Sequence, residues 1–281
     1  MSAEEVKKTL FEEMKEHEGV SRYFLERKKP VILRLDGRAF HTYTKGLVKP
    51  FDAVLVTTMR ETMLKLCEKI EGTIMGYTQS DEISLLLGDW RQETTQSFFG
   101  NNIQKITSVA ASMCTLYFSQ YFSKNVHEAY DRGEISENDI EKYRKKIESG
   151  ATFDCRCFNL PNNEEVLKYF IWRQKDCIRN SIQATAQSLF SHKELNCKNC
   201  DEQVEMMLKE KDFDWETQIS EINKYGTVAE KTRVRALVVN RHTNETEEKE
   251  RRIWQYCEHT PIFKNDREYV NCRIAEWESE N

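Results

Sequence analysis

Long apolar runs, a basic excess and stretches rich in proline or glycine are all missing from this sequence. No apolar run approaches the ~20 residues that a membrane-spanning helix needs, so no membrane-embedded segment is expected. The formal net charge is −5, with 42 Lys and Arg against 47 Asp and Glu, whereas nucleic-acid-binding proteins usually carry a basic excess. An RNA-binding surface would therefore have to be a local cluster. With 4 prolines and 10 glycines among 281 residues, no linker or repeat divides the chain.

Targeting signals and a disulfide framework are also missing. The N-terminus has no apolar signal core, and it contains Glu4 and Glu5, which a mitochondrial transit peptide would avoid. The nine cysteines are an odd number, and without a secretion signal we expect them to be reduced. The sequence therefore predicts a cytoplasmic protein, although a mature mitochondrial form would look the same.

The residues that are present support a sizeable core, with 39% hydrophobic and 11% aromatic content. Helical spacing of apolar residues predicts helices within 1–29 and over 51–70, 97–122, 164–190 and 201–211, with a charged, exposed helical segment at 124–149. Apolar or alternating runs predict strands at 31–35, 74–75, 83–87, 153–160, 232–240 and 251–256, and the acidic end after Ile274 is expected to fray. This order favours a single α+β catalytic unit over 1–281, with a core at about 20–190 and a C-terminal elaboration at about 191–281.

Carboxylates stand at the ends of two predicted strands. Asp36-Gly37 follows the apolar run 31–35, and Ser80-Asp81-Glu82 precedes the apolar run 83–87. Two buried strands that each carry an aspartate at one end can bring the two aspartates together, and Mg²⁺ prefers hard oxygen ligands. Two ions ~3.5–4 Å apart can activate an attacking hydroxyl and stabilise a leaving oxygen. We therefore predict that Asp36 and Asp81 hold two Mg²⁺ ions for phosphoryl transfer, with the Gly37 carbonyl as a further ligand.

Simpler interpretations of these residues remain open at this point. A lone Asp-Gly pair is more often a turn, and a lone Ser-Asp-Glu is more often a cap or a surface loop. Glu82 fits either a metal ligand or an outer partner of the ligands, and Ser80 can donate to a phosphate. Lys45, Lys49 and Lys105 are available cations for a triphosphate. No Walker A, HExxH or GxSxG pattern is present.

One face of the predicted helix 164–190 groups polar residues. Arg173, Asp176 and Asn180 lie at i, i+3 and i+7 and so share a face, flanked by Trp172 and Arg179. A solvated polar stripe is the ordinary interpretation. An aromatic ring, two arginines and an amide can also hold an RNA end, which makes Arg173, Arg179 and Asn180 candidate RNA-binding residues.

Five segments, in matching order, carry a resemblance to a known family. They are residues 34–41, 49–52, 76–82, 108–112 and 172–177, which include the Asp36-Gly37, Ser80-Asp81-Glu82 and Trp172-Arg173 stretches. Together they resemble the tRNA-His guanylyltransferase superfamily over roughly residues 20–230.

The resemblance implies a polymerase-palm-like (ferredoxin-like) antiparallel sheet with packed helices and a C-terminal helix and hairpin elaboration. It implies a homotetramer that adds nucleotides to the 5′ end of tRNA in the 3′–5′ direction, after ATP or GTP activates the 5′-phosphate. It makes Asp36, Asp81 and Glu82 catalytic and makes Asp36, Gly37 and Asp81 ligands of two Mg²⁺ ions. The nucleotide- and triphosphate-binding positions that it implies are Arg34, Arg38, Ala39, Phe40, His41, Lys49, Ser80 and Lys105.

One departure bears on the reaction. Guanylyltransferases proper carry His-Ile-Asn-Asn where this chain has Ile178-Arg179-Asn180-Ser181. That substitution is similar to the guanylyltransferase-like branch of 3′–5′ RNA polymerases, which prefer template-dependent repair of 5′-truncated tRNA. We therefore predict templated repair first and addition of G at position −1 of tRNA-His second. A non-catalytic tRNA-binding module is a third interpretation, which the carboxylates at both strand ends argue against, and a cyclase-like palm enzyme is a fourth.

Overall fold

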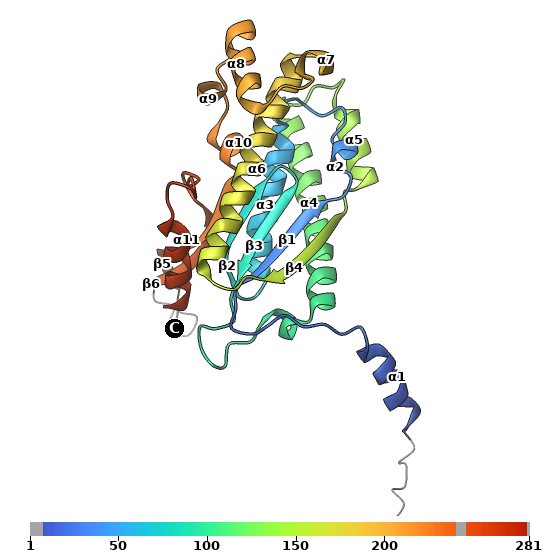
Figure 1. Ribbon diagram of the computed structural model, residues 1–281, viewed down its shortest axis with the longest axis vertical. Coiled ribbons are helices and arrows are strands. Elements are labelled where there is room, and N and C mark those ends of the chain that lie inside the picture. The colour runs from blue at the N-terminus through green and yellow to red at the C-terminus, as the bar shows by residue number, and fades with distance from the viewer. Residues whose placement is uncertain (1–7, 240–245, 280–281) are drawn as a thin grey trace, which may run out of the picture.

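A six-stranded sheet with helices on both faces forms the body of the computed structural model (Figure 1). The structure describes residues 8–239 and 246–279. The strands are β1 (Val31–Gly37), β2 (Thr73–Gln79), β3 (Glu82–Leu87), β4 (Phe153–Asn159), β5 (Thr227–Val239) and β6 (Thr246–Tyr256). The helices are α1 (Leu10–Gly19), α2 (Phe40–Tyr43), α3 (Ala53–Lys69), α4 (Ile103–Asp131), α5 (Ile140–Ser149), α6 (Asn163–Leu189), α7 (His192–Leu195), α8 (Cys200–Lys211), α9 (Trp215–Gln218), α10 (Glu221–Tyr225) and α11 (Glu268–Glu278).

The strand order is β4-β1-β3-β2-β5-β6, and all neighbours run antiparallel. In chain order, β1, α3, β2, β3, α4 and β4 form a β-α-β-β-α-β unit, which is the ferredoxin-like arrangement. The β5–β6 hairpin pairs with the free edge of β2 and extends the same sheet. The predicted α+β fold class is confirmed. The hairpin strands are longer than expected, and Asn240, the predicted end of one of them, lies outside the described residues.

Alternation along the strands divides the core into two layers. On one face, Leu33 and Leu35 of β1 belong to the cluster that contains the buried residues of α3 and α4. On the other face, Ile32 and Leu86 pack with Phe170 of α6. Figure 1 shows α4 behind the sheet and α6 in front of it beside β3, with β1 and β4 uncovered on the front side. The ends of β1 and β3 are therefore accessible beside α6.

The long helix α4 begins six residues later than the sequence predicts. Residues Phe98–Asn101 form a 3-10 turn in which Phe99 has a φ of 50°, and the Asn102 side chain caps α4 by accepting from the Lys105 amide at 3.0 Å. The helix then runs through to Asp131. Its buried stripe is Ile106, Ala110, Cys114, Phe118, Phe122 and Val126. The apolar residues Met113, Tyr117 and Tyr121, each one position before a residue of this stripe, are only half-buried, because contact with the sheet decides which apolar positions face the core.

The expectation that the chain frays after Ile274 is wrong. Helix α11 continues to Glu278, and Ile274 and Trp277 are 1% and 5% exposed. Trp277 packs edge-on against Trp90 with ring centroids 5.2 Å apart, and the Trp90 indole donates to Glu278 at 2.6 Å. The C-terminal segment is acidic in composition, yet its apolar residues Ile274 and Trp277 line up on one side of α11 and complete the core on the α6 face.

The charged segment 124–149 is less exposed than expected. Its first part belongs to α4, and α5 buries Ile140 and Tyr143. The Tyr143 hydroxyl donates to the Asp52 carboxylate at 2.6 Å. This contact fixes α5 against the N-terminus of α3.

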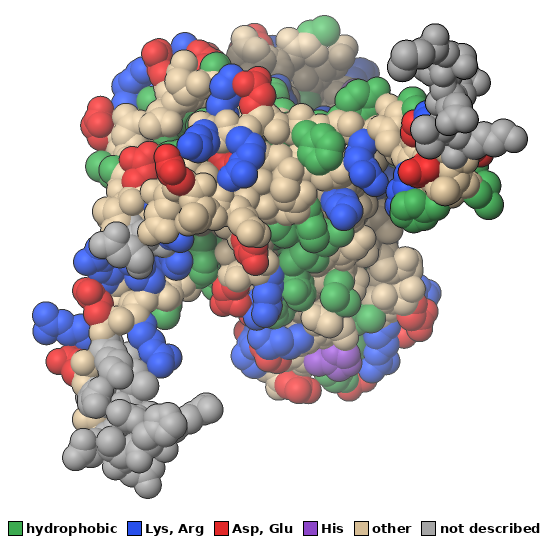
Figure 2. Space-filling model, turned by 90° about the horizontal axis from the view of Figure 1, so that it is seen from below, with side chains coloured by type: hydrophobic (Ala, Val, Ile, Leu, Met, Phe, Trp, Pro, Cys, Tyr) green, Lys and Arg blue, Asp and Glu red, His purple; other side chains and the backbone are tan. Residues whose placement is uncertain are grey.

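The N-terminal helix α1 stands away from the body (Figures 1 and 2). A capping box at Thr9 and Glu12 starts it, but it buries no residue. Leu10, Phe11 and Met14 are 72%, 69% and 51% exposed. Val6, predicted on the same stripe, and the acidic pair Glu4 and Glu5 lie outside the described residues. None of the described helices is both long and apolar enough to span a membrane.

Candidate active site

The structure brings Asp36 and Asp81 to the same end of adjacent strands. Asp36 pairs in register with Glu82, and the Gly37 amide donates to the Asp81 carbonyl at 3.1 Å. Gly37 is required by space, because a Cβ there would lie 2.1 Å from Cδ2 of the buried Phe40 ring. The turn after β1 therefore folds back over Phe40 and holds Asp36 beside the β2–β3 turn.

The two aspartates lack a positive partner. The Asp36 carboxylate accepts no hydrogen bond and forms no ion pair within residues 8–239 and 246–279. Burial raises the pKa of Asp81 above its usual value, and the charge of Asp36 adds to the rise. The Ser80 hydroxyl, which donates to Asp81 at 3.0 Å, opposes the rise. Two neighbouring carboxylates without a positive partner, one of them with a raised pKa, would be stabilised by a hard cation. The donor set fits Mg²⁺.

The Glu82 carboxylate lies on the same sheet face as Asp36, its cross-strand partner, and contacts α6. Its Oε1 accepts from the Nε of Arg173 at 2.8 Å, and both side chains are buried, with 8% and 7% exposed. Burial raises the pKa of Glu82, and the Arg173 charge opposes the rise. Arg173 also donates to Asp176 at 2.7 Å. Within one chain, Glu82 and Arg173 thus form a buried ion pair beside the aspartates. This contact fits the interpretation of Glu82 as an outer partner of the predicted metal ligands, and it leaves Arg173 hidden from solvent.

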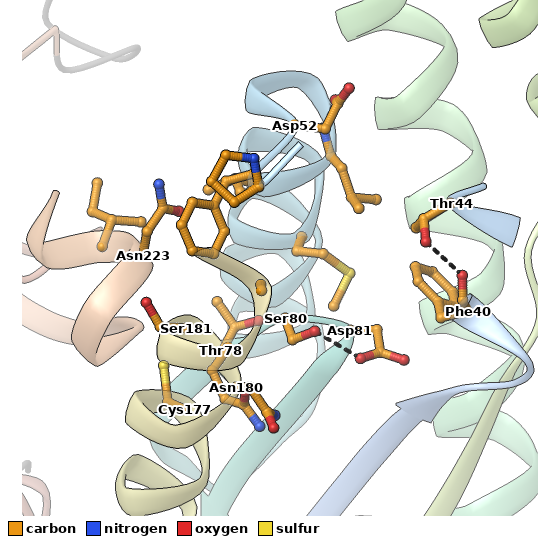
Figure 3. Close-up of a pocket in the computed structure, with 18 of the residues that line it drawn as sticks. Phe40, Thr44, Asp52, Thr78, Ser80, Asp81, Cys177, Asn180, Ser181 and Asn223 are labelled. Atoms are coloured by element: carbon orange, nitrogen blue, oxygen red, sulfur yellow. Dashed lines mark hydrogen bonds between the residues drawn. The ribbon is translucent and has the colours of Figure 1, made fainter. Parts of the chain in front are cut away.

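A cavity of about 400 Å³ opens beside Asp81. It lies at the end of the sheet, between the α2–α3 connection, α3, the β2–β3 turn, α6 and α10. Its volume is typical of small-molecule sites. Figure 3 shows Ser80 and Asp81 between one wall with Phe40 and Thr44 and another with Cys177, Asn180 and Ser181. The sequence-predicted residues that line it are Phe40, His41, Lys49, Ser80, Asp81 and Asn180.

Sequence reasoning missed several lining residues. Asn223 and Thr227 come from the segment assigned to the C-terminal elaboration, and Gln79 lies within β2. The Gln79 Oε1 and Thr227 Oγ1 atoms are buried without a hydrogen-bond partner among the described residues, so both can accept a hydrogen bond from a ligand. Gln79 could have been found, because it directly precedes Ser80-Asp81-Glu82 in the segment 76–82, whereas no local pattern marks Thr227.

Asp52 lines the cavity but is already engaged. Its carboxylate accepts from the amides of Leu55 at 3.0 Å and Val48 at 3.1 Å, and from the Tyr143 hydroxyl. It is the N-cap of α3. Asp52 therefore shapes the wall rather than supplying a free carboxylate.

Other predicted residues lie outside the cavity. Lys105 is in the first turn of α4, next to Ile106, which contacts a small cavity formed with Val31 and Leu87. That is the opposite end of β1, about 16 Å from Asp36 at a rise of ~3.3 Å per residue. The structure of one chain does not bring Lys105 to Asp81.

The remaining predicted residues surround the site. Arg38 and Ala39 form the exposed turn into α2, with Ala39 at a φ of 53°. Arg34 lies on the sheet face with its guanidinium 5.7 Å from the Trp172 ring centroid. Arg179 is exposed on α6, where it pairs with Asp176.

Comparisons with known proteins identify the family of the chain. The family model described as tRNAHis guanylyltransferase matches residues 11–161. Solved structures of a bacterial tRNA(His) guanylyltransferase-like protein in complex with ATP and with GTP are 37% and 34% identical, with TM-scores of 0.77 and 0.72. Each alignment covers 95% of this chain and 99% of the other. The tRNA(His) guanylyltransferase of Debaryomyces hansenii is 28% identical over 79% of this chain and 80% of its own length.

The matched segment contains both strand-end aspartates, the β2–β3 turn and the whole β-α-β-β-α-β unit that positions them. The chain therefore belongs to the tRNAHis guanylyltransferase family of nucleotidyltransferases.

Proposed function

We propose that this protein adds nucleotides to the 5′ end of tRNA in the 3′–5′ direction, following a template, and so repairs 5′-truncated tRNA. The observation that carries the proposal is the pair Asp36 and Asp81 at neighbouring strand ends, without a cationic side-chain partner among the described residues, together with the cavity of about 400 Å³ that Asp81 lines. The solved relatives in complex with ATP and GTP support nucleotide binding by this chain.

The reaction has two steps, and different residues of the site act in each. Lys49 and Ser80, which line the cavity, bind the phosphates of ATP or GTP while the RNA 5′-phosphate attacks and pyrophosphate leaves. In the second step, the 3′-hydroxyl of the incoming NTP attacks the activated 5′-phosphorus and AMP or GMP leaves. Two Mg²⁺ ions held by Asp36, Asp81 and the Gly37 carbonyl would lower the pKa of the attacking hydroxyl and neutralise the phosphates. Asp36 and Asp81 orient both steps because they lie on rigid strand ends.

The segment 178–181 supports a templated rather than a tRNA-His-specific reaction. Ile178 packs in the apolar cluster between α6 and α8, and the Ser181 hydroxyl accepts from the Trp215 indole at 3.2 Å. Asn180 and Ser181 line the cavity, and Arg179 is the exposed residue of the four. The positions of the His and the last Asn of guanylyltransferases proper are held here by Ile178, which packs, and by Ser181, which is engaged by Trp215, so contacts to a particular base are reduced.

A templated extension assay tests this function. Several tRNAs lacking their first nucleotide are incubated with ATP and all four NTPs, each in versions that differ only in the opposite base. The added nucleotide is expected to follow that base, and indifference to it would refute repair. Asp36→Ala and Asp81→Ala should each reduce extension by more than the roughly 10–100-fold that loss of an outer partner costs a metal site, and retained extension would refute the metal assignment.

Addition of G at position −1 of tRNA-His is the second candidate, favoured by the activity named for the Debaryomyces hansenii relative. Full-length tRNA-His as the best substrate in the same assay would select it. We also propose that the chain forms a homotetramer in which a second copy covers Leu10, Phe11 and Met14, exposed on α1. Light scattering tests this, since a mass of 33.3 kDa would show a monomer.

A further inference from the structure

The uncovered half of the sheet face carries ordered rows of charge. Figure 1 shows β1 and β4 without a helix in front of them, beside α6. Cross-strand partners on this side form rows over β4, β1 and β3. The row at the strand ends is Asp154, Asp36 and Glu82, and the row two residues further in is Arg156, Arg34 and Ser84. The acids of the candidate active site are therefore followed on the open surface by two arginines.

Both arginines keep hydrogen-bonding capacity for a ligand. The charge of Arg34 acts on Glu82, but its Nε is buried without a hydrogen-bond partner in the described part of the protein. The Arg156 guanidinium has one weak ion pair among the described residues, with Asp154 at 3.9 Å, and 57% of its side chain is exposed. Like charges directly opposite each other across a strand pair destabilise a sheet. An anion bound between Arg34 and Arg156 would relieve that repulsion.

An exposed aromatic ring lies beside the arginines. Trp172 of α6 is 53% exposed, although an indole this large is usually mostly buried. Its ring is placed by the Arg173 guanidinium, 4.2 Å from the centroid, and by the edge of Tyr169 at 6.0 Å. The ring therefore has a fixed orientation next to Arg34 and retains exposed surface on which a nucleobase can stack.

We propose that this surface, made of Arg34, Arg156 and Trp172, binds the RNA strand that leads to the reacting 5′ end. The arginines hold consecutive backbone phosphates, and Trp172 stacks on an unpaired base. The proposal rests on the proposed function, because the strand reaches Asp36 and Asp81 by crossing from the arginine row to the acid row. Phosphate contacts and stacking are both independent of sequence, which suits an enzyme that repairs many tRNAs. It also explains how a chain with a net charge of −5 binds RNA, since the positive charge is local.

The test measures the affinity of the full-length chain for 5′-truncated tRNA without any NTP, over a range of salt concentrations. Trp172→Leu is expected to weaken binding roughly 5- to 100-fold. Arg156→Ala should lower affinity for all tRNAs alike and reduce the salt slope by about 1.

Matched controls come from other surfaces. Arg144, with 58% of its side chain exposed and one ion pair at 4.0 Å, resembles Arg156, and Leu116, 52% exposed, resembles Trp172. Arg144→Ala and Leu116→Ala should leave the tRNA affinity unchanged. Circular dichroism and thermal melting confirm that each variant is folded.

Parental tRNA affinity in both Trp172→Leu and Arg156→Ala would overturn the proposal. So would a loss of ATP affinity at unchanged tRNA affinity, since that would make the surface a nucleotide site. Binding is measured without NTP and so does not depend on catalysis. If the variants weaken tRNA binding but the protein shows no templated extension, the RNA-binding surface stands and only the proposed function is rejected.

Discussion

Replacing Arg173 by leucine tests whether Glu82 is a structural carboxylate beside the proposed metal ligands rather than one of them. The Arg173 Nε lies 2.8 Å from the Glu82 Oε1, and the two side chains are 7% and 8% exposed. Glu82 has a second acid, Asp36, as its direct cross-strand neighbour. Arg173→Leu would leave Glu82 buried without its counter-charge, so we expect it to lower the free energy of unfolding by about 3–5 kcal/mol at pH 8.

The loss should depend on pH with a definite sign. Burial raises the pKa of Glu82 above 4.5 and Arg173 opposes this rise, so removing Arg173 raises the pKa of Glu82 further. A carboxyl group whose pKa is higher in the folded than in the unfolded state binds more protons when folded, and its variant loses stability as pH rises. The deficit of Arg173→Leu relative to the parent should therefore shrink between pH 8 and pH 5.

Urea denaturation of the metal-free protein at both pH values measures these differences. The double variant Glu82→Leu with Arg173→Leu is the control, since replacing a whole buried ion pair by apolar residues is often close to neutral. A deficit below about 1 kcal/mol, or one that is equal at the two pH values, would refute a buried pair and return Glu82 to the role of a direct metal ligand.

Two further predictions concern how the site is framed. Asp52→Ala removes the cap of α3 and two other accepted hydrogen bonds. It should lower the free energy of unfolding by about 2–3 kcal/mol, and Tyr143→Phe should lower it by about 1 kcal/mol. Equal stability of Asp52→Ala and the parent in urea would contradict the role of Asp52 as a structural cap. Trp277→Ala, at a position 5% exposed, should cost about 3–5 kcal/mol, and a melting temperature equal to that of the parent would show that α11 is a dispensable tail after all.

The sequence alone was sufficient for the skeleton of the fold and for the core of the site. Strand periodicity located β1, β3 and β4, and helical spacing located α3 and α6, because each is a continuous segment whose burial pattern is local. The Asp36 and Asp81 pairing was predictable for the same reason. A strand followed by an acid and an acid followed by a strand meet at one edge when the strands are neighbours.

Sequence patterns placed other elements less well. The start of α4 was misjudged because the 3-10 turn at Phe98–Asn101 interrupts an otherwise continuous apolar spacing. The acidic C-terminus was misjudged because a charged surface conceals the apolar stripe of Ile274 and Trp277. In both cases the outcome depends on contacts that join segments far apart in the chain.

The use of each charged residue was decided only by tertiary structure. Arg173 and Arg179 lie on one helix and both pair with Asp176, yet one is buried on Glu82 and the other is exposed. Arg156 carries no local signal, and only the antiparallel register of β1 and β4 places it opposite Arg34. Local spacing determines which face of its own element a residue occupies. Whether that face meets a carboxylate, a cavity or solvent is set by the partner that the fold places against it.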